Sequence, residues 1–169
     1  MKNTENLLTH LDQLIRSNDY ESRIEKRSQV NLYDTIVVRI KMQKSESESK
    51  VEIIYFPRVK IELDNTDLVQ FYFQFPYELT KAKIDSVRPL LPHLNSRISI
   101  GYLSVNETER KIQYKYVYAH QQDIKPNPTH FLDVFEIFYY TPCLHEATIL
   151  NYLKGILSLE AAIEGLETR

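Results

Sequence analysis

The 169-residue sequence predicts an α+β fold with an N-terminal helix, an antiparallel sheet of about five strands and C-terminal helices. Three observations predict this class. Apolar residues recur with the helical period at both ends of the chain, they alternate with polar residues in the middle, and short polar segments separate the alternating runs. Because the length is that of one domain with a substantial core, we expect residues 1–169 to form a single domain.

The first predicted element is an amphipathic helix that begins near the N-terminus. Asn3 or Thr4 is expected to cap it, since both side chains can accept a hydrogen bond from the first turn. Residues 17–30 lose the helical period and are expected to form an irregular connection. The apolar stripe of the helix consists of Leu7, Leu8, Leu11, Leu14 and Ile15.

Three strands follow, and the short turns between them favour an antiparallel meander. The first covers residues 32–42, and the charged segment 44–50 reads as an exposed turn. The second runs over 51–63 and is interrupted at Pro57, where we expect a bulge, bend or edge position because proline has no N–H to donate. Its apolar positions beyond the proline are Val59, Ile61 and Leu63. A turn at 64–67 leads to the third strand, residues 68–75, which sends Val69, Phe71, Phe73 and Phe75 to one face.

A helix interrupted by proline and a hairpin form the next part. Residues 79–96 predict a helix that Thr80 caps and that Pro89 and Pro92 kink or divide, because an interior proline costs about 3 kcal/mol. The polar loop 106–110 then joins two strands of a hairpin. The residues expected to alternate across these strands are Ile98, Ile100, Tyr102 and Ser104 in the first, and Ile112, Tyr114, Tyr116 and Tyr118 in the second.

Two C-terminal helices complete the predicted fold. Thr129 is expected to cap the first, which Pro142 either ends or separates from the next. The last helix covers about 143–166, with a break or close crossing at Gly155, since a glycine inside a helix costs roughly 1 kcal/mol. Its apolar residues extend further round the helix than one core face requires. The helix that Thr129 caps is predicted to bury Phe131, Leu132, Phe135, Phe138 and Tyr139.

Composition argues against several classes of protein. The chain has 21 Lys plus Arg and 23 Asp plus Glu, and the resulting net charge of −2 argues against nucleic-acid binding. Three glycines are too few for a glycine-rich phosphate loop. No apolar run approaches the roughly 20 residues of a membrane span, and the N-terminus is too polar for a signal peptide. We therefore expect a cytoplasmic protein that binds neither nucleic acid nor membrane.

No group of residues has the pattern of a catalytic or metal site. The five histidines, at positions 10, 93, 120, 130 and 145, include no pair four residues apart, and the single cysteine excludes a cysteine-rich metal site. We therefore expect no metal, no cofactor and no catalytic residues. The alternative is an enzyme or small-ligand protein whose site is assembled from distant residues around His130, Cys143 and His145.

Residues 90–120 (LLPHLNSRISIGYLSVNETERKIQYKYVYAH) carry a family resemblance. Together with the order of the elements, they resemble the bacterial type III secretion chaperones, and more closely the YbjN-type family of that superfamily. The matching features are Leu94-Asn95 at the end of a helix, Gly101 in a strand, Asn106-Glu107 in an acidic turn and the aromatic strand 114–118. FLDVFEIFYYTP and HEATILNYLKGI resemble the closing helices. The chain departs from the family at Pro57, at 17–30 and beyond Gly155.

The resemblance implies a noncatalytic protein-binding module, a chaperone or regulatory adaptor that binds a protein client and forms a homodimer. Surplus apolar area is compatible with this, since it favours burial against a second chain. The candidate residues for contact with a partner are Leu7, Leu11, Phe73, Tyr114, Tyr116 and Tyr118. The alternative for each of them is that it lies in the core.

Overall fold

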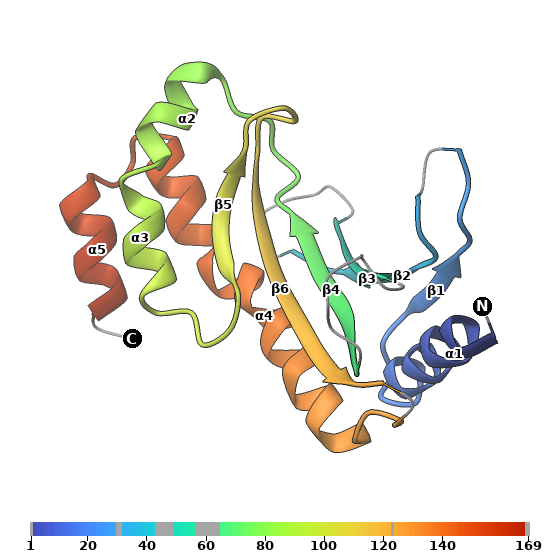
Figure 1. The fold of residues 1–169 in the computed structure, drawn as a ribbon. Helices are drawn as coiled ribbons and strands as arrows, with labels where there is room; N and C mark the ends of the chain where they lie inside the picture. The colour runs from blue at the N-terminus through green and yellow to red at the C-terminus, as the bar shows by residue number, and fades with distance from the viewer. Residues whose placement is uncertain (1, 30–31, 43–48, 57–64, 123, 168–169) are drawn as a thin grey trace.

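A computed structural model describes residues 2–29, 32–42, 49–56, 65–122 and 124–167. It confirms the α+β class, and the described residues form a six-stranded antiparallel sheet rather than one of five strands (Figure 1). The predicted bend at Pro57, the apolar positions beyond it and most of the turn 44–50 lie outside the described residues. In chain order the elements are α1 (Lys2–Arg16), β1 (Ser22–Glu25), β2 (Thr35–Ile40), β3 (Ser49–Phe56), β4 (Thr66–Gln74), α2 (Lys81–Val87), α3 (Leu90–Asn95), β5 (Tyr102–Asn106), β6 (Lys111–Gln121), α4 (Pro128–Leu153) and α5 (Leu159–Glu167).

The strands lie in the order β1-β2-β3-β4-β6-β5, and each neighbouring pair is antiparallel. Strands β2, β3 and β4 form the predicted meander, and β6 adds the hairpin to it. Phe73 lies opposite Val51 on β3 and opposite Tyr114 on β6. This register aligns the alternating apolar residues on one face, as their period of two predicts. We call this face the core face and the opposite one the outer face.

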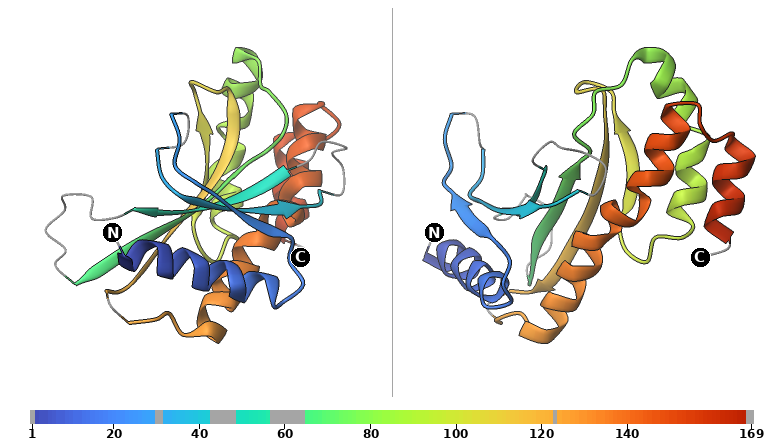
Figure 2. Two further views of the ribbon diagram at one scale, coloured as in Figure 1. Left: turned by 90° about the vertical axis from the view of Figure 1, so that its right-hand side faces the viewer. Right: turned by 180° about the vertical axis from the view of Figure 1, so that it is seen from behind.

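Helix α4 covers the core face, and α1 lies against β1 and β2 (Figure 2). Phe138 of α4 stacks on Tyr114, with 4.3 Å between the ring centroids. Phe131 and Phe138 lie 5.9 and 5.4 Å from the ring of Phe71. The aromatic side of α4 covers this face because its phenylalanines pack against the aromatic residues of β4 and β6. Helix α1 buries Leu8, Leu11 and Ile15.

Strand β1 falls within residues 17–30, which the sequence predicts to be irregular. Ile24 pairs with Ile36 of β2, and Ser22 pairs with Val38. The strand is only four residues long, so it contains too few alternating positions for a period of two to be recognised in the sequence. Pairing with β2 decides its structure, and that pairing is a tertiary contact.

Strand β5 begins at Tyr102 rather than at Ile98, because Gly101 turns the backbone. Gly101 has a φ of +72°, and a Cβ atom there would lie 2.4 Å from the carbonyl oxygen of Lys115. Only glycine tolerates both conditions. The turn changes the phase of the alternation, so Leu103 faces the core while Tyr102 and Ser104 face outward.

Asn95 joins α3 to the edge strand β5. The backbone N–H of Leu103 donates to Asn95 Oδ1 at 2.7 Å, and Asn95 Nδ2 donates to the carbonyl oxygen of Leu103 at 3.0 Å. The side-chain amide thus pairs with β5 as another strand would. Because edge strands carry unpaired backbone groups, this contact protects part of the edge. Leu94, the preceding residue, is buried in the core.

Helix boundaries follow the predictions in part. The side chain of Thr80 caps α2 by accepting from the N–H of Lys83, and the helix divides near Pro89 as expected. Gly155, with a φ of +71°, separates α4 from α5 as expected. The cap of α4 is Asn127 rather than Thr129, because Pro128 is favourable at the first helical position. Helix α1 begins at Lys2, just before the predicted caps.

Helix α4 continues through Pro142, where the sequence predicts an end or a new start. It is 26 residues long, and residues on both sides of the proline, such as Phe138 and Ile149, are fully buried. The hydroxyl of Thr141 donates to the carbonyl oxygen of Ile137 at 2.6 Å. Burial of several large apolar side chains, worth about 1.5–3 kcal/mol each, outweighs the roughly 3 kcal/mol cost of the proline.

Candidate functional site

The residues predicted to contact a partner lie in the core. Leu11, Phe73 and Tyr114 are inaccessible to solvent and Tyr118 is nearly so. Leu7 and Tyr116 are partly buried against the same core. Burial raises the pKa of Tyr114 to about 12, and its hydroxyl donates to the carbonyl oxygen of Ile100. These side chains stabilise the fold, and the surface available to a partner lies elsewhere.

His130, Cys143 and His145 do not converge on a site. His130 lies in the first turn of α4, and the other two lie 13 and 15 residues further along the same helix, about 20 Å away at 1.5 Å per residue. The thiol of Cys143 lies 3.8 Å from the carbonyl oxygen of Lys41. Burial, and after it the charge of Glu146, raises the pKa of this thiol, whereas a nucleophilic cysteine needs a lowered pKa.

Among the described residues no group of three or more His, Cys, Asp or Glu side chains could hold a metal ion. In the same part of the chain, no helix combines the length and the apolar character that crossing a membrane requires. The described surface offers two candidate contact sites.

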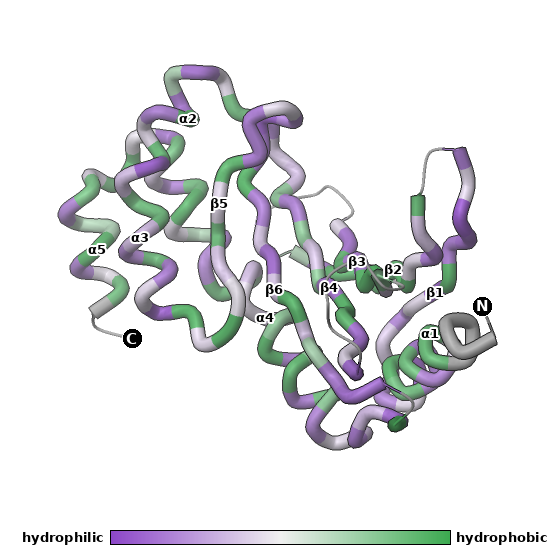
Figure 3. Tube along the Cα trace, in the orientation of Figure 1, coloured by the Kyte–Doolittle hydropathy of each residue, from purple (hydrophilic) through white to green (hydrophobic). Residues whose placement is uncertain are grey.

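The first surface is an apolar stripe on α4, which carries hydrophobic residues along much of its length (Figure 3). Ile137, Tyr140 and Leu144 are 42%, 50% and 63% exposed. They follow the i, i+3, i+7 spacing of one helix face, and this face lies away from Phe135 and Phe138, which contact the core. We call these three residues the α4 stripe.

Tyr20 lies beside the α4 stripe and contacts its central residue, Tyr140. Its hydroxyl donates to a carboxylate oxygen of Glu136 at 3.2 Å and lies 3.4 Å from the hydroxyl of Tyr140. The ring of Tyr20 also packs edge-on against Phe135, at 4.9 Å between centroids. Burial, followed by the hydrogen bond with Tyr140, raises the pKa of Tyr20, so this hydroxyl keeps its proton.

The sequence contains the signal for the α4 stripe, although surplus apolar surface was predicted on the last helix. Ala162 and Leu166 of that helix are buried in the structure. Once the buried side of α4 is assigned to its phenylalanines, Ile137, Tyr140 and Leu144 remain at helical spacing on the other side. Which apolar residues of α4 remain exposed depends on which side of the helix packs against the sheet, and tertiary packing determines that side.

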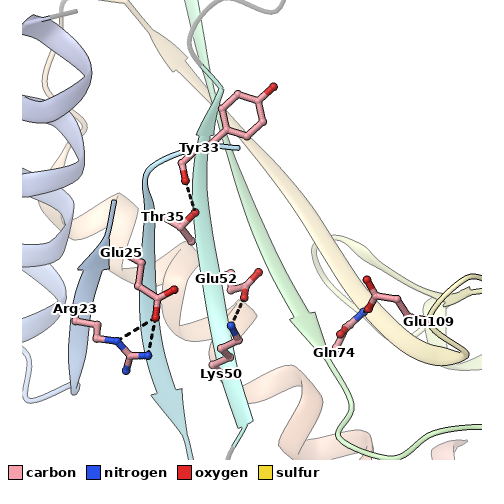
Figure 4. Close-up of polar contacts among 8 residues, drawn as sticks. All are labelled: Arg23, Glu25, Tyr33, Thr35, Lys50, Glu52, Gln74 and Glu109. Atoms are coloured by element: carbon pink, nitrogen blue, oxygen red, sulfur yellow. Dashed lines mark hydrogen bonds and ion pairs between the residues drawn. The ribbon is translucent and has the colours of Figure 1, made fainter. Parts of the chain in front are cut away.

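The second surface is the outer face of the sheet, where charged and polar side chains meet (Figure 4). Arg23 forms an ion pair with Glu25 at 2.6 Å on β1, and Lys50 forms one with Glu52 at 2.6 Å on β3. The amide of Gln74 on β4 donates to Glu109 in the β5–β6 turn. Lys50, Gln74 and Glu109 gather near the same end of β3 and β4.

A hollow of about 250 Å³ opens on this outer face. Hydrogen bonds position Tyr72, which lines the hollow. Its hydroxyl donates to Gln113 Oε1 at 3.3 Å, and Gln113 Nε2 donates to Ser104 Oγ at 3.0 Å. The ammonium of Lys115 lies 5.2 Å from the centre of the Tyr72 ring, within the range of a cation–π contact. The residues that line the hollow are Ser49, Lys50, Glu52, Tyr72, Gln74, Pro76 and Lys111.

Comparisons with known proteins do not assign the chain to a family. A scan against protein-family models finds no match for the chain, and a search of curated proteins finds no similar sequence. The fold and the two surfaces define an α+β protein whose helices cover the core face of an antiparallel sheet and which exposes an apolar helix stripe and a polar sheet face.

Proposed function

We propose that the protein is a noncatalytic, cytoplasmic protein-binding module of the chaperone or adaptor type, and that it forms a homodimer. The observation that carries this proposal is the α4 stripe. Three large apolar side chains, exposed together on one helix face, favour burial against a second apolar surface. His130 lies about 20 Å along α4 from Cys143 and His145, and this separation favours a protein that acts by binding a partner over one that catalyses a reaction.

The α4 stripe is complementary to itself. When two copies of α4 pack antiparallel about an axis between Tyr140 and Thr141, Ile137 of each copy lies opposite Leu144 of the other. Tyr140 of each copy then lies near the axis. Such isologous packing is the commonest interface geometry in homo-oligomers.

The expected strength of this contact is modest. Complete burial of a large apolar side chain is worth about 1.5–3 kcal/mol, so half-exposed side chains gain about 1 kcal/mol each, or about 6 kcal/mol for the two stripes together. Association costs roughly 4–15 kcal/mol of translational and rotational freedom. Residues that flank the stripe must therefore contribute, and one charged substitution within the stripe is enough to dissociate the dimer.

Size-exclusion chromatography with light scattering tests the proposal. The wild-type protein at micromolar concentration should have a mass of about 40 kDa, twice that of the 20.0 kDa chain. Leu144→Asp should give a monomer with an unchanged circular dichroism spectrum. The matched control is Ile156→Asp, which changes an equally exposed apolar residue beyond the end of α4 and should leave the dimer intact.

A wild-type protein that remains a monomer at 100 µM contradicts the homodimer. A dimer that Leu144→Asp leaves intact contradicts the role of the α4 stripe.

A further inference from the structure

The outer face carries positive charge that its own carboxylates do not balance. Lys50 is paired with Glu52, whereas Lys111 and Lys115 have no carboxylate within ion-pair distance in the part of the chain that the structure describes. Glu109, in the β5–β6 turn, accepts from the neutral amide of Gln74, which lines the hollow. In the described part of this region, the ammonium groups of Lys50, Lys111 and Lys115 therefore face the two carboxylates of Glu52 and Glu109.

Two further carboxylates near the β5–β6 turn are paired with arginines and do not balance these lysines. Glu107, in the β5–β6 turn, pairs with Arg88 of the α2–α3 connection. Arg110, beside Lys111, pairs with Glu78 at 2.8 Å. Among the described residues around the hollow, Lys111 and Lys115 of β6 thus carry the positive charge that no ion pair compensates.

Lys111 and Lys115 are spaced along one strand face. They lie four residues apart on β6, which is about 13 Å at 3.3 Å per residue. Gln113 lies between them on the same face, held by its hydrogen bonds to Tyr72 and Ser104. Lys111 lines the hollow, so an anionic group can reach it there.

An apolar pair continues the row beyond Lys115. Val117, two residues further along β6, and Tyr102, opposite Lys115 on β5, are both about half exposed. Along β6 the outer face therefore offers an ammonium in a hollow, a second ammonium about 13 Å away and an apolar patch next to it.

We propose that the outer face binds an extended acidic segment of a partner protein. Its two carboxylates are four residues apart, and an apolar residue stands two positions beyond the second. One carboxylate occupies the hollow at Lys111, the other meets Lys115, and the apolar side chain rests on Tyr102 and Val117. An extended segment has the same rise per residue as β6, so its groups match this spacing.

This inference rests on the proposed function, because it names the chemistry of a protein partner. It uses a different surface from the α4 stripe, so the two can fail separately. A dimer without peptide binding overturns only this inference, and peptide binding by a protein that is always a monomer overturns only the proposed homodimer.

Fluorescence anisotropy with labelled peptides tests the inference. The probe is a symmetric peptide, Val-Ser-Glu-Ser-Thr-Ser-Glu-Ser-Val, in which the direction of the chain does not matter. It should bind the wild-type protein, and binding should weaken as salt is raised, since ion pairs at a surface are screened. A peptide with both Glu changed to Gln, and one with its Glu residues only two positions apart, should bind at least threefold more weakly.

Variants of the protein locate the contact. Lys111→Gln and Lys115→Gln should each weaken binding about threefold to fivefold, which is the range expected for one exposed ion pair. Lys83→Gln changes an exposed lysine on α2 and should leave binding unchanged. Circular dichroism should show that all three variants fold.

Three results would overturn the inference. The first is no binding of the probe at millimolar concentration in low salt. The second is equal binding by Lys111→Gln, Lys115→Gln and the wild type. The third is complete displacement of the peptide by equimolar free glutarate, which shows a site for small dicarboxylic acids instead of an extended segment.

Discussion

Asn95→Ala should destabilise the protein by about 2–4 kcal/mol. The substitution removes two hydrogen bonds, of 2.7 and 3.0 Å, between the side-chain amide and the backbone of Leu103. Leu103 is buried, and a buried backbone group that loses its partner costs about 1–3 kcal/mol. Two such groups would cost about 2–6 kcal/mol, and partial access of water to the half-buried Asn95 keeps the sum in the lower half of that range. A domain with a total stability of about 5–15 kcal/mol should show this loss clearly.

Urea unfolding followed by circular dichroism measures the effect. Arg97→Ala, at an exposed position two residues away, is the control and should change the free energy of unfolding by less than about 0.5 kcal/mol. Hydrogen exchange of the Leu103 amide should also become faster in Asn95→Ala. A loss below 0.5 kcal/mol, with unchanged exchange at Leu103, would refute the reasoning that α3 protects the edge of β5.

Asn95→Asp separates the two hydrogen bonds. At pH 7 the carboxylate still accepts from the Leu103 N–H, but its second oxygen faces the Leu103 carbonyl oxygen and repels it. This repulsion raises the pKa of the introduced carboxyl in the folded state. The protonated form can donate to the carbonyl, so the deficit relative to wild type should shrink as the pH falls from 7 toward about 4, the pKa of the carboxyl in the unfolded chain, and should be smallest below that pH. A deficit that grows in acid would contradict the arrangement.

Three further predictions concern single residues. Gly101→Ala should lower the free energy of urea unfolding by at least about 3 kcal/mol, because it adds a clash with the Lys115 carbonyl oxygen to the cost of the left-handed conformation. Gly155→Ala, which has open space around it, should lower it by only about 1–2 kcal/mol. Equal costs would contradict the close approach of Gly101 to Lys115. Burial and then the charge of Lys125 lower the pKa of His10 in the folded protein, so the free energy of unfolding should fall as the pH drops below 6.5, and His10→Gln should reduce this slope. Cys143 should react with iodoacetamide at pH 7.5 more slowly than in urea, because burial raises the thiol pKa; equal rates would contradict its half-buried position.

The sequence predicts the sheet well where a strand is long enough for its alternation to be read. Val69, Phe71 and Phe73 face the core as their period indicates, and the break at Gly155 follows from the conformational freedom of glycine. Strand β1 could not be predicted, since four residues carry too little pattern and pairing with β2 determines it. The same applies to α4 at Pro142, where burial on both sides outweighs the local preference.

The candidate surfaces are harder to predict than the fold. Tyr114 and Tyr118 have the apolar, aromatic character of contact residues, but α4 covers them, and no local signal reports that cover. The α4 stripe becomes visible only when the buried side of that helix is known. Lys111 and Lys115 alternate with aromatic residues in the sequence, and the structure adds the hollow and the charge balance that give these lysines a proposed role.

A cross-linking measurement tests the central claim, that two copies meet through α4, most directly. In a Cys143→Ser background, Tyr140→Cys places a thiol near the proposed two-fold axis, where the two copies of the residue lie close together. Mild oxidation should convert most of this variant to a disulfide-linked dimer, whereas Ile156→Cys in the same background should remain a monomer under denaturing electrophoresis. Equal cross-linking of both variants, or none with Tyr140→Cys, would contradict the account.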